Sequence, residues 1–565
     1  MLELCGIDYS RFAVSLVVAF TFLCVPGAHG GVSDHASDPY FQGSPQKGSI
    51  SLFAKAQQIA PCHHRQDPLN MPSERPNTER KALSVNLDPR RYGSFAEIGA
   101  GQEVVRWFFR VGGAAGTIAK SMSAYDMSVS DAIYGHCDRY VCRQRLEDML
   151  DHEHRLNIER LRESRGDTTA FFVFADTVSA RNFKGTNDCH GWMGVRFQAH
   201  PRDQDSQIIV HVRMLDTENA LQQEALGIVG VNLLYGAFFL NHEPEQLIES
   251  LLDNLSTRRI EIDMIEFSGI AFRHVDNRVM SLRLVQLGLS KAAMFSARGE
   301  VLQPSEALYK KPILVERGSF RPLTNVNVDM LSAAYEKFCH EPDVAADQVV
   351  SLAEITMHNL QAAGDIDLRD FMARVDLLAA GGMTVLISDY FEYYRLAAYL
   401  ARYTKNKIGI TMGAGSLCDL FDEKYYTQLD GGILESFGRL FKNDLKLYIY
   451  PLLDRNTGKL TTVENLNVAP ELRKLYEYLV DKGCIEQLDN FKPQYLSTFS
   501  REVLRQIETG DPGWTEHVPA AVADTIRRRG FFGYRRPSTA SQTQRGSIPA
   551  PLEITTNMAF PTAQV

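Results

Sequence analysis

Between residues 311 and 534, short apolar segments alternate with amphipathic helical segments, and this alternation constrains the fold more than any other feature. The apolar segments cover residues 313–315, 349–355, 384–387, 407–412 and 445–450. Helical periodicity separates them, at 328–339, 368–380, 391–403, 417–426 with 433–441, and 463–479. Parallel strands need long, usually helical crossovers, so the pattern predicts a doubly wound, parallel, five-stranded α/β domain. Ligands of such a sheet bind beyond the carboxyl ends of its strands.

Residues 82–310 have a different pattern, which predicts a separate α+β or α/β domain of unknown role. Apolar or alternating segments predict strands at 170–175, 192–197, 207–214 and 259–267. Amphipathic or apolar periodicity predicts helices at 141–163 and 221–240. The strict alternation in 207–214 predicts a half-exposed edge strand with His211 pointing outward.

The two ends of the chain lack this periodicity. Residues 1–81 are predicted to be an apolar leader and a disordered tail, and residues 535–565 a second disordered tail. Nine cysteines spread along the chain without a dense framework favour reduced thiols and a cytoplasmic protein. If residues 12–31 act as a signal peptide, the protein is instead exported. The apolar run is short for a stable membrane span.

Net charge and cysteine spacing favour neither a nucleic-acid partner nor a metal site. The formal net charge of −9 gives no electrostatic footprint for nucleic acid. Two clusters contain metal-ligand residue types: Cys62-His63-His64, and His136-Cys137 with Cys142. Neither repeats a spaced ligand pair, so no metal site is predicted. The oligomeric state is not defined by the sequence.

The first apolar segment of the regular half ends in a tight turn at Gly318 and Ser319, and a helical pattern starts near Val328. A strand, a turn and a helix N-terminus in this order favour phosphate binding, because backbone N–H groups and the positive end of the helix dipole converge there. Residues 413–416, Gly-Ala-Gly-Ser, follow the fourth segment. They are open to two interpretations, a second phosphate loop or a turn with Ser416 as a helix N-cap.

Two motifs at the ends of this half carry a resemblance. Residues 318–327, Gly-Ser-Phe-Arg-Pro-Leu-Thr-Asn-Val-Asn, resemble the signature of nicotinate-nucleotide adenylyltransferases, and residues 500–534 are similar to the closing region of that family. The family belongs to the Rossmann-like nucleotidyltransferase superfamily. As a whole, the chain also resembles a bacterial family whose members carry inconsistent names. The resemblance implies adenylyl transfer from ATP, with Mg²⁺, to a nicotinate mononucleotide, with release of pyrophosphate.

The resemblance also implies roles for individual residues. Thr324 and Asn327 stand where the family has two phosphate-binding histidines, and with Arg321 they are the expected catalytic residues. The expected nucleotide-binding residues are Gly318, Ser319, Phe320, Ser500, Arg501 and Arg505. Neither Thr nor Asn can carry the positive charge of a histidinium. The alternative hypothesis is therefore a non-catalytic sensor or scaffold that binds a nucleotide or a protein.

Two further motifs occur in the first half. Glu97-Ile98-Gly99-Ala100-Gly101 resembles the nucleotide loop of a methyltransferase, but the sequence favours a helix whose small residues allow close packing. Cys189-His190 precedes Trp192 on an expected loop. This pair is open to two interpretations, a catalytic pair or a turn beside a packed tryptophan.

Overall fold

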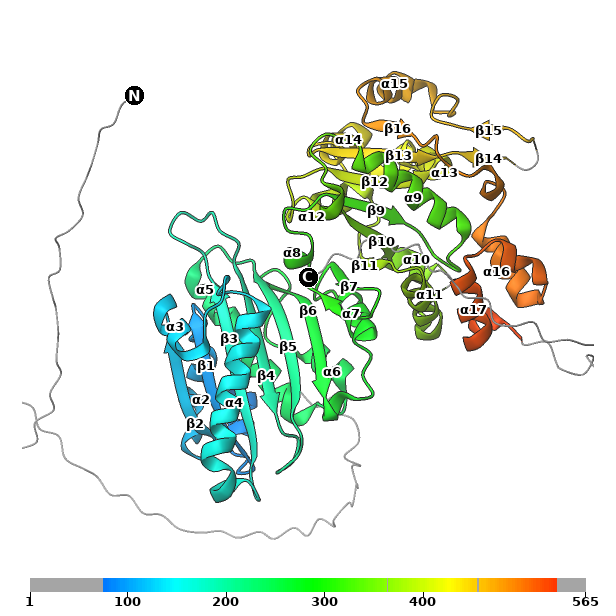
Figure 1. Ribbon diagram of the computed structural model, residues 1–565. Coiled ribbons are helices and arrows are strands. Elements are labelled where there is room, and N and C mark those ends of the chain that lie inside the picture. The colour runs from blue at the N-terminus through cyan, green and yellow to red at the C-terminus, as the bar shows by residue number, and fades with distance from the viewer. Residues whose placement is uncertain (1–74, 363, 455–456, 536–565) are drawn as a thin grey trace, which may run out of the picture. The chain divides into compact units, whose positions relative to one another are not determined.

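The computed structural model describes residues 75–362, 364–454 and 457–535 (Figure 1). These residues fall within one compact unit. They form an α/β protein with two mixed sheets, of six and eight strands, and a separate two-stranded ribbon. The apolar run at 12–25, the Cys62-His63-His64 cluster and the tail at 536–565 lie outside the described residues.

The first sheet has the strand order β2-β1-β3-β4-β5-β6. Its strands are β1 (Arg91–Gly99), β2 (Ile118–Ala124), β3 (Ala170–Ser179), β4 (His190–Phe197), β5 (Ser206–Met214) and β6 (Ile260–Gly269). β1 pairs in parallel with β2 and β3, and the pairs from β3 to β6 are antiparallel. The sheet is therefore mixed, and its antiparallel half contains the alternating segment predicted from the sequence.

Helices cover both faces of the first sheet. They are α1 (Thr78–Asn86), α2 (Val104–Val111), α3 (Met127–Tyr134), α4 (Arg143–Arg165), α5 (Asn219–Phe239), α6 (Pro244–Ser250) and α7 (Asn277–Gln286). One core joins α2 and α5 to Phe95, Phe174 and Val195 of the strands. The other joins Leu146 and Leu150 of α4 to the opposite face, along which α4 runs in Figure 1.

The expected edge position of β5 is wrong. β5 lies between β4 and β6, and His211 is only 1% exposed. Helices bury both sides of the sheet, so the polar positions of the alternating pattern point into a second core. His211 is accommodated there by hydrogen bonds, which a period-2 pattern does not reveal.

The second sheet has the order β16-β13-β12-β9-β10-β11-β7-β8. Its strands are β7 (Ala292–Phe295), β8 (Val301–Leu302), β9 (Ile313–Arg317), β10 (Val350–Thr356), β11 (Thr384–Ser388), β12 (Ile408–Gly413), β13 (Leu445–Tyr450) and β16 (Ile485–Gln487). The strands from β16 to β11 are parallel, and β7 and β8 are antiparallel to their neighbours. The strands β14 (Leu452–Leu453) and β15 (Leu460–Thr461) form the ribbon.

The helices of the second half again lie in two layers. They are α8 (Pro304–Ala307), α9 (Asn325–Cys339), α10 (Met357–Gln361), α11 (Leu368–Ala380), α12 (Tyr393–Leu400), α13 (Ala414–Leu420), α14 (Gly432–Leu440), α15 (Arg473–Asp481), α16 (Ser500–Thr509) and α17 (Ala520–Arg529). α9, α11, α16 and α17 share a core with Leu314 and Ala353 of the sheet. α12 to α15 share the other core, with Ile313 and Val315.

All five strands predicted in the regular half are present, as β9 to β13, and the sheet contains three more. β16 is too short to give a clear apolar run. β7 and β8 precede residue 311 in the chain, yet β7 pairs with β11. Strand pairing in the second sheet thus starts at Ala292, whereas the domain boundary at 310/311 stays a prediction. Among the described residues, no helix is long and apolar enough to cross a membrane.

Gly93 provides a test of the packing between β1 and β3. A Cβ atom at Gly93 would lie 2.1 Å from the carbonyl oxygen of Phe172 and 2.5 Å from its ring, which is impossible without a shift of backbone. We expect Gly93→Ala to lower the free energy of unfolding by about 1–3 kcal/mol, measured by urea denaturation. Gly116→Ala is the control, because nothing lies within 4 Å of its added Cβ. Equal denaturation midpoints for the two variants would contradict this packing.

Candidate functional site

The turn after β9 occupies the centre of the second sheet, between β10 and β12. The N–H of Gly318 donates to Glu354 O at 3.1 Å, and Asn359 Nδ2 donates to Gly318 O at 3.3 Å. Phe320 is buried with a φ of 45°. In the part of the chain that the structure describes, the N–H groups of Ser319 and Phe320 have no protein acceptor. The turn is thus fixed at Gly318, and the two amides that follow have no acceptor among the described residues.

Thr324 and Asn327 form a capping box at the start of α9. The N–H and Oγ1 of Thr324 donate to Asn327 Oδ1 at 3.1 and 2.8 Å. Asn327 Nδ2 donates to Glu316 Oε1 at 2.8 Å. Both side chains therefore have structural partners, and Thr324 is only 1% exposed. Their expected catalytic role stays a prediction that this geometry does not favour.

The N-terminus of α9 is also covered by protein. The N–H of Asn325 donates to His517 O at 2.8 Å, and its Nδ2 donates to Glu516 O at 3.0 Å. These carbonyls belong to the 3₁₀ turn η7 (Pro512–Glu516) and the residue after it. The segment after α16 thus caps the helix end at which the sequence placed a phosphate.

Arg321 is held at the same turn by a carboxylate. Its Nε donates to Asp370 Oδ1 at 2.5 Å, and Arg374 Nε donates to Asp370 Oδ2 at 2.6 Å. Arg374 Nη1 also donates to Ser319 O at 3.2 Å. The Arg321 side chain is 38% exposed, so part of it faces solvent, but its charge is already paired.

Ser500, Arg501 and Arg505 lie on the first two turns of α16. Val503 and Ile507 bury the inner face of this helix, which leaves both arginines exposed on its outer face. Among the described residues, no hydrogen bond or ion pair joins these three side chains to the turn at 318–321. Instead, the segment after α16 reaches the start of α9 through η7. The expected nucleotide contacts of Ser500, Arg501 and Arg505 stay predictions.

Two buried carboxylates at this edge were not predicted from the sequence. Glu316 is fully buried with Oε2 unpartnered among the described residues, and burial raises the pKa of its carboxyl to about 8. Glu354 accepts from Arg317 Nε and Nη2 at 2.8 and 3.0 Å, and from Ser388 Oγ at 2.5 Å. A carboxylate near the carboxyl end of an apolar strand was the available signal for both.

The second candidate loop, at residues 413–416, follows β12 beside the turn of β9. Gly413 is the N-cap of α13, so Ser416 lies within the helix. Gly415 and Ser416 are exposed. The Gly-Ala-Gly-Ser segment therefore presents a small, accessible surface at the end of the neighbouring strand.

The loop Glu97–Gly101 of the first half contains a buried acidic pair. Glu97 Oε1 accepts from the N–H of Val104 at 2.8 Å, at the start of α2, and burial raises its pKa to about 8. Asp176 faces it in register, fully buried, and burial raises its pKa as well. A Cβ at Gly101 would lie 1.9 Å from Asp176 Oδ1. Close packing against the Asp176 carboxyl thus explains why residue 101 is a glycine. The space beside Gly101 is occupied by this side chain.

Cys189 and His190 lead into β4, where His190 joins a buried chain of polar groups. His211 Nδ1 lies 2.6 Å from Asp263 Oδ1, and its Nε2 lies 3.1 Å from His190 Nδ1. Asp263 is the extra residue of a bulge opposite His211 and Val212. Burial and the neighbouring His211 lower the pKa of His190 to about 4. Because bulges re-aim side chains, this aspartate reaches a histidine that the alternating pattern placed outside.

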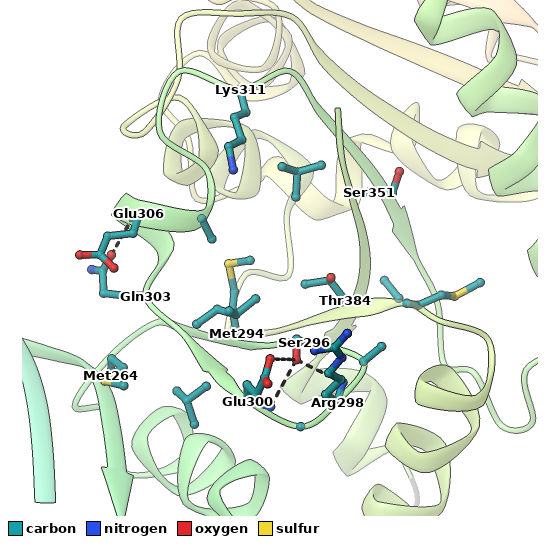
Figure 2. A pocket seen from close by; sticks show the side chains of 18 of the residues that line it. Met264, Met294, Ser296, Arg298, Glu300, Gln303, Glu306, Lys311, Ser351 and Thr384 are labelled. Atoms are coloured by element: carbon teal, nitrogen blue, oxygen red, sulfur yellow. Dashed lines mark hydrogen bonds between the residues drawn. The ribbon is translucent and has the colours of Figure 1, made fainter. Parts of the chain in front are cut away.

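A cavity of about 850 Å³ lies near the amino ends of β10 and β11, away from the Gly318 turn (Figure 2). Val350, Ser351 and Thr384 line it from these strands, and Lys311 lines it from the segment before β9. At the β7–β8 turn, Ser296 Oγ donates to Glu300 Oε2 at 3.1 Å (Figure 2). Strand order alone would not have located this cavity, because it lies at the opposite ends of the strands.

Within the described ranges, no group of three or more His, Cys, Asp or Glu side chains could hold a metal ion. The sequence cluster at His136, Cys137 and Cys142 is only partly assembled. The two sulfurs lie 3.7 Å apart, whereas His136 Nδ1 faces Asp131 at 3.3 Å.

Comparison with known proteins gives a partial structural likeness. No family model and no curated protein matches the chain. A competence/damage-inducible protein from Agrobacterium tumefaciens is 14% identical, over 28% of this chain and 93% of its own, with a TM-score of 0.21. A competence or damage-inducible protein from Enterobacter asburiae is also 14% identical, over 28% and 95%, with a TM-score of 0.20. A CinA superfamily protein from Enterobacter cloacae is 11% identical, over 30% and 96%, with a TM-score of 0.22.

These findings overturn both family resemblances inferred from the sequence. The three structures named above are of competence-damage proteins and not of adenylyltransferases, and no family model supports either predicted resemblance. The physical reason lies at the signature residues. Thr324 and Asn327 form a capping box, and Asn327 also donates to the buried carboxyl of Glu316. A likeness with a TM-score this low carries no argument about function.

Glu316 gives this edge a defined pH dependence. Its pKa is raised to about 8 in the folded chain, above the value of about 4.3 expected in the unfolded chain. Its contribution to stability is complete below about pH 4 and is lost as pH rises through about 8. We expect Glu316→Gln to remove up to about 1.4 kcal/mol of this loss per pH unit, measured by urea denaturation between pH 5 and 8. Parallel pH profiles for wild type and variant would contradict the assignment.

Proposed function

We propose that the carboxyl edge of the second sheet, between the ends of β9 and β12, binds a nucleotide without transferring its adenylyl group. One observation carries the proposal: the N–H groups of Ser319 and Phe320 are unpartnered among the described residues, directly after the central strand. Successive free amides form a concave anion site, which suits a phosphate. ATP with Mg²⁺ is the proposed ligand, with the metal held mainly by the phosphates.

Support comes from the strand order. In the parallel part of the sheet, the order β11-β10-β9-β12-β13-β16 corresponds to 3-2-1-4-5-6 along the chain. This is the order of a doubly wound, Rossmann-like sheet, in which connections leave β9 and β12 in opposite directions. The loops after these two strands separate there, and ligands of such sheets occupy the resulting crevice.

The surroundings of this edge suit the other parts of a nucleotide. Gly415 and Ser416, exposed after β12, leave room for a ribose or a further phosphate. Phe391 follows β11, is 46% exposed and packs against His358 and Tyr425, with ring centroids 5.0 and 5.7 Å apart. A supported aromatic ring with an open face can stack on a base.

The proposal excludes turnover because the side chains at the turn are already engaged. Thr324 and Asn327 bond to each other, and Arg321 is paired with Asp370. Loss of one preorganised group that stabilises developing charge typically costs about 2.7–4 kcal/mol of transition-state stabilisation. Backbone amides alone can hold a phosphate, but they supply no positive charge as pyrophosphate leaves.

Isothermal titration of the full chain with ATP and Mg²⁺ tests binding, and a pyrophosphate-release assay with nicotinate mononucleotide tests transfer. We expect binding with 1:1 stoichiometry and no pyrophosphate above the background of the buffer. Ser319→Glu adds a negative charge at an exposed position beside the free amides. It should weaken binding at least about tenfold, because like charges repel at short range.

Ser164→Glu is the matched control, since Ser164 is also exposed but lies at the end of α4 in the first half. It should bind ATP as the wild type does. Unchanged affinity in Ser319→Glu would place the nucleotide elsewhere. Pyrophosphate released by the wild type, and lost in Asn327→Ala, would instead establish a transferase.

A further inference from the structure

The loop between α3 and α4 brings two cysteines together. Cys137 Sγ and Cys142 Sγ lie 3.7 Å apart. Both thiols point at one carbonyl oxygen, that of Arg139, at 3.0 and 2.9 Å. Within the described part of the chain, the remaining free cysteines, Cys189, Cys339, Cys418 and Cys484, show no such thiol contact. Cys137 and Cys142 are thus the pair that local structure has already aligned.

The loop is held at both ends, so the two thiols meet because of its fold. Buried Arg145 donates through Nη2 to Gly135 O at 2.7 Å and to Asp131 Oδ1 at 2.9 Å. Tyr140 OH donates to Asp131 Oδ2 at 2.9 Å, and Thr177 Oγ1 donates to Tyr140 O at 2.5 Å. A disulfide has an S–S bond of about 2.05 Å. The sulfurs therefore need to approach each other by less than about 2 Å, which side-chain rotation and a small loop shift supply.

The two thiols differ in access. Cys137 is half-buried, between the exposed residues His136 and Asp138. Cys142 is buried and is the N-cap of α4, where its sulfur accepts from the N–H of Arg145 at 3.4 Å. An oxidant in solution meets Cys137 first, and Cys142 lies behind it.

We propose that Cys137 and Cys142 form a reversible redox site that reacts with small disulfides of the glutathione class. The Cys137 thiolate attacks one sulfur of glutathione disulfide, which breaks that S–S bond and releases one glutathione. The Cys142 thiolate then attacks the Cys137 sulfur of the mixed disulfide and releases the second glutathione. The two protein thiols lose two electrons and two protons, and glutathione disulfide is reduced to two glutathione molecules.

The environment of Cys142 controls the second step. Burial raises the pKa of the Cys142 thiol to about 11, so only a small fraction is thiolate near neutral pH. The intramolecular step should therefore accelerate as pH rises. Closure also removes both thiol donors from Arg139 O, on a loop whose Arg139 guanidinium lies 5.8 Å from the Tyr309 ring centroid. The α3–α4 loop is thus the part of the fold that the disulfide changes.

Tryptic peptides make the reaction directly visible. Trypsin cleaves after Lys120, Arg139 and Arg143, which separates Cys137, in peptide 121–139, from Cys142, in peptide 140–143. The reduced full chain is incubated with glutathione disulfide, its remaining thiols are alkylated, and the digest is analysed by mass spectrometry. We expect the two peptides linked, with the summed mass less two hydrogen atoms, and we expect reduced glutathione to reverse the link.

Three variants separate this pairing from general thiol oxidation. Cys142→Ser keeps a hydroxyl N-cap for α4, and it should leave Cys137 as a stable mixed disulfide with glutathione. Cys137→Ser should leave Cys142 unmodified. Cys418→Ser, at an exposed thiol on α13, should form the linked peptides as the wild type does. The proposal is overturned if wild-type Cys137 keeps its glutathione, pairs with another cysteine, or stays free while Cys418 is modified.

Discussion

The buried ion pair between Arg317 and Glu354 fixes the carboxyl edge of the second sheet. Arg317 bonds Glu354 through Nε and Nη2, and it also donates to the carbonyls of Tyr390 and Phe391. Ser388 completes the carboxylate. One guanidinium thus ties together the ends of β9, β10 and β11. Removal of one partner from such a pair typically costs about 3–5 kcal/mol, because the other charge stays buried. The Gly318 turn starts at the next residue, so its geometry depends on this pair.

The side chains around that turn mostly complete the fold. Asn327 caps a helix with its oxygen and donates from its amide to Oε1 of Glu316, while Arg321 joins Arg374 on Asp370. These bonds leave the N–H groups of Ser319 and Phe320 as the polar groups of the turn without a partner among the described residues. A backbone site holds a ligand by shape and partial charge, so removal of a neutral side chain leaves its donors in place. Catalysis of phosphoryl or adenylyl transfer needs groups that stabilise the charge developing in the transition state. The side chains of Arg321, Thr324 and Asn327 are instead bonded to other protein groups.

The sequence allowed much of the second sheet to be predicted and little of the site. β9 to β13 were predictable because each is a buried apolar run between turn residues. β5 was placed wrongly because period 2 assigns His211 to solvent. The partners of His211 are Asp263 and Gln303, which lie 52 and 92 residues away and leave no local signal.

The turn at Gly318 was predictable from strand and turn residues. The spacing of Thr324 and Asn327 matches a capping box, so the helix start was open to this interpretation before any nucleotide role. The burial of Glu316 was not predictable from the sequence, because it depends on tertiary packing.

The hydrogen bonds from Asn325 to Glu516 and His517 join the first helix of the second sheet's parallel part to a segment about 190 residues later. During synthesis, α9 emerges early, but the carbonyls that complete its N-terminus emerge only near the end of the described chain. Until then, the protein bonds at the start of α9 are those of its capping box and the bond from Asn327 to Glu316. The carboxyl edge of the sheet is therefore completed last, after the strands that form it, and a chain that ends before η7 lacks the partners of this helix start.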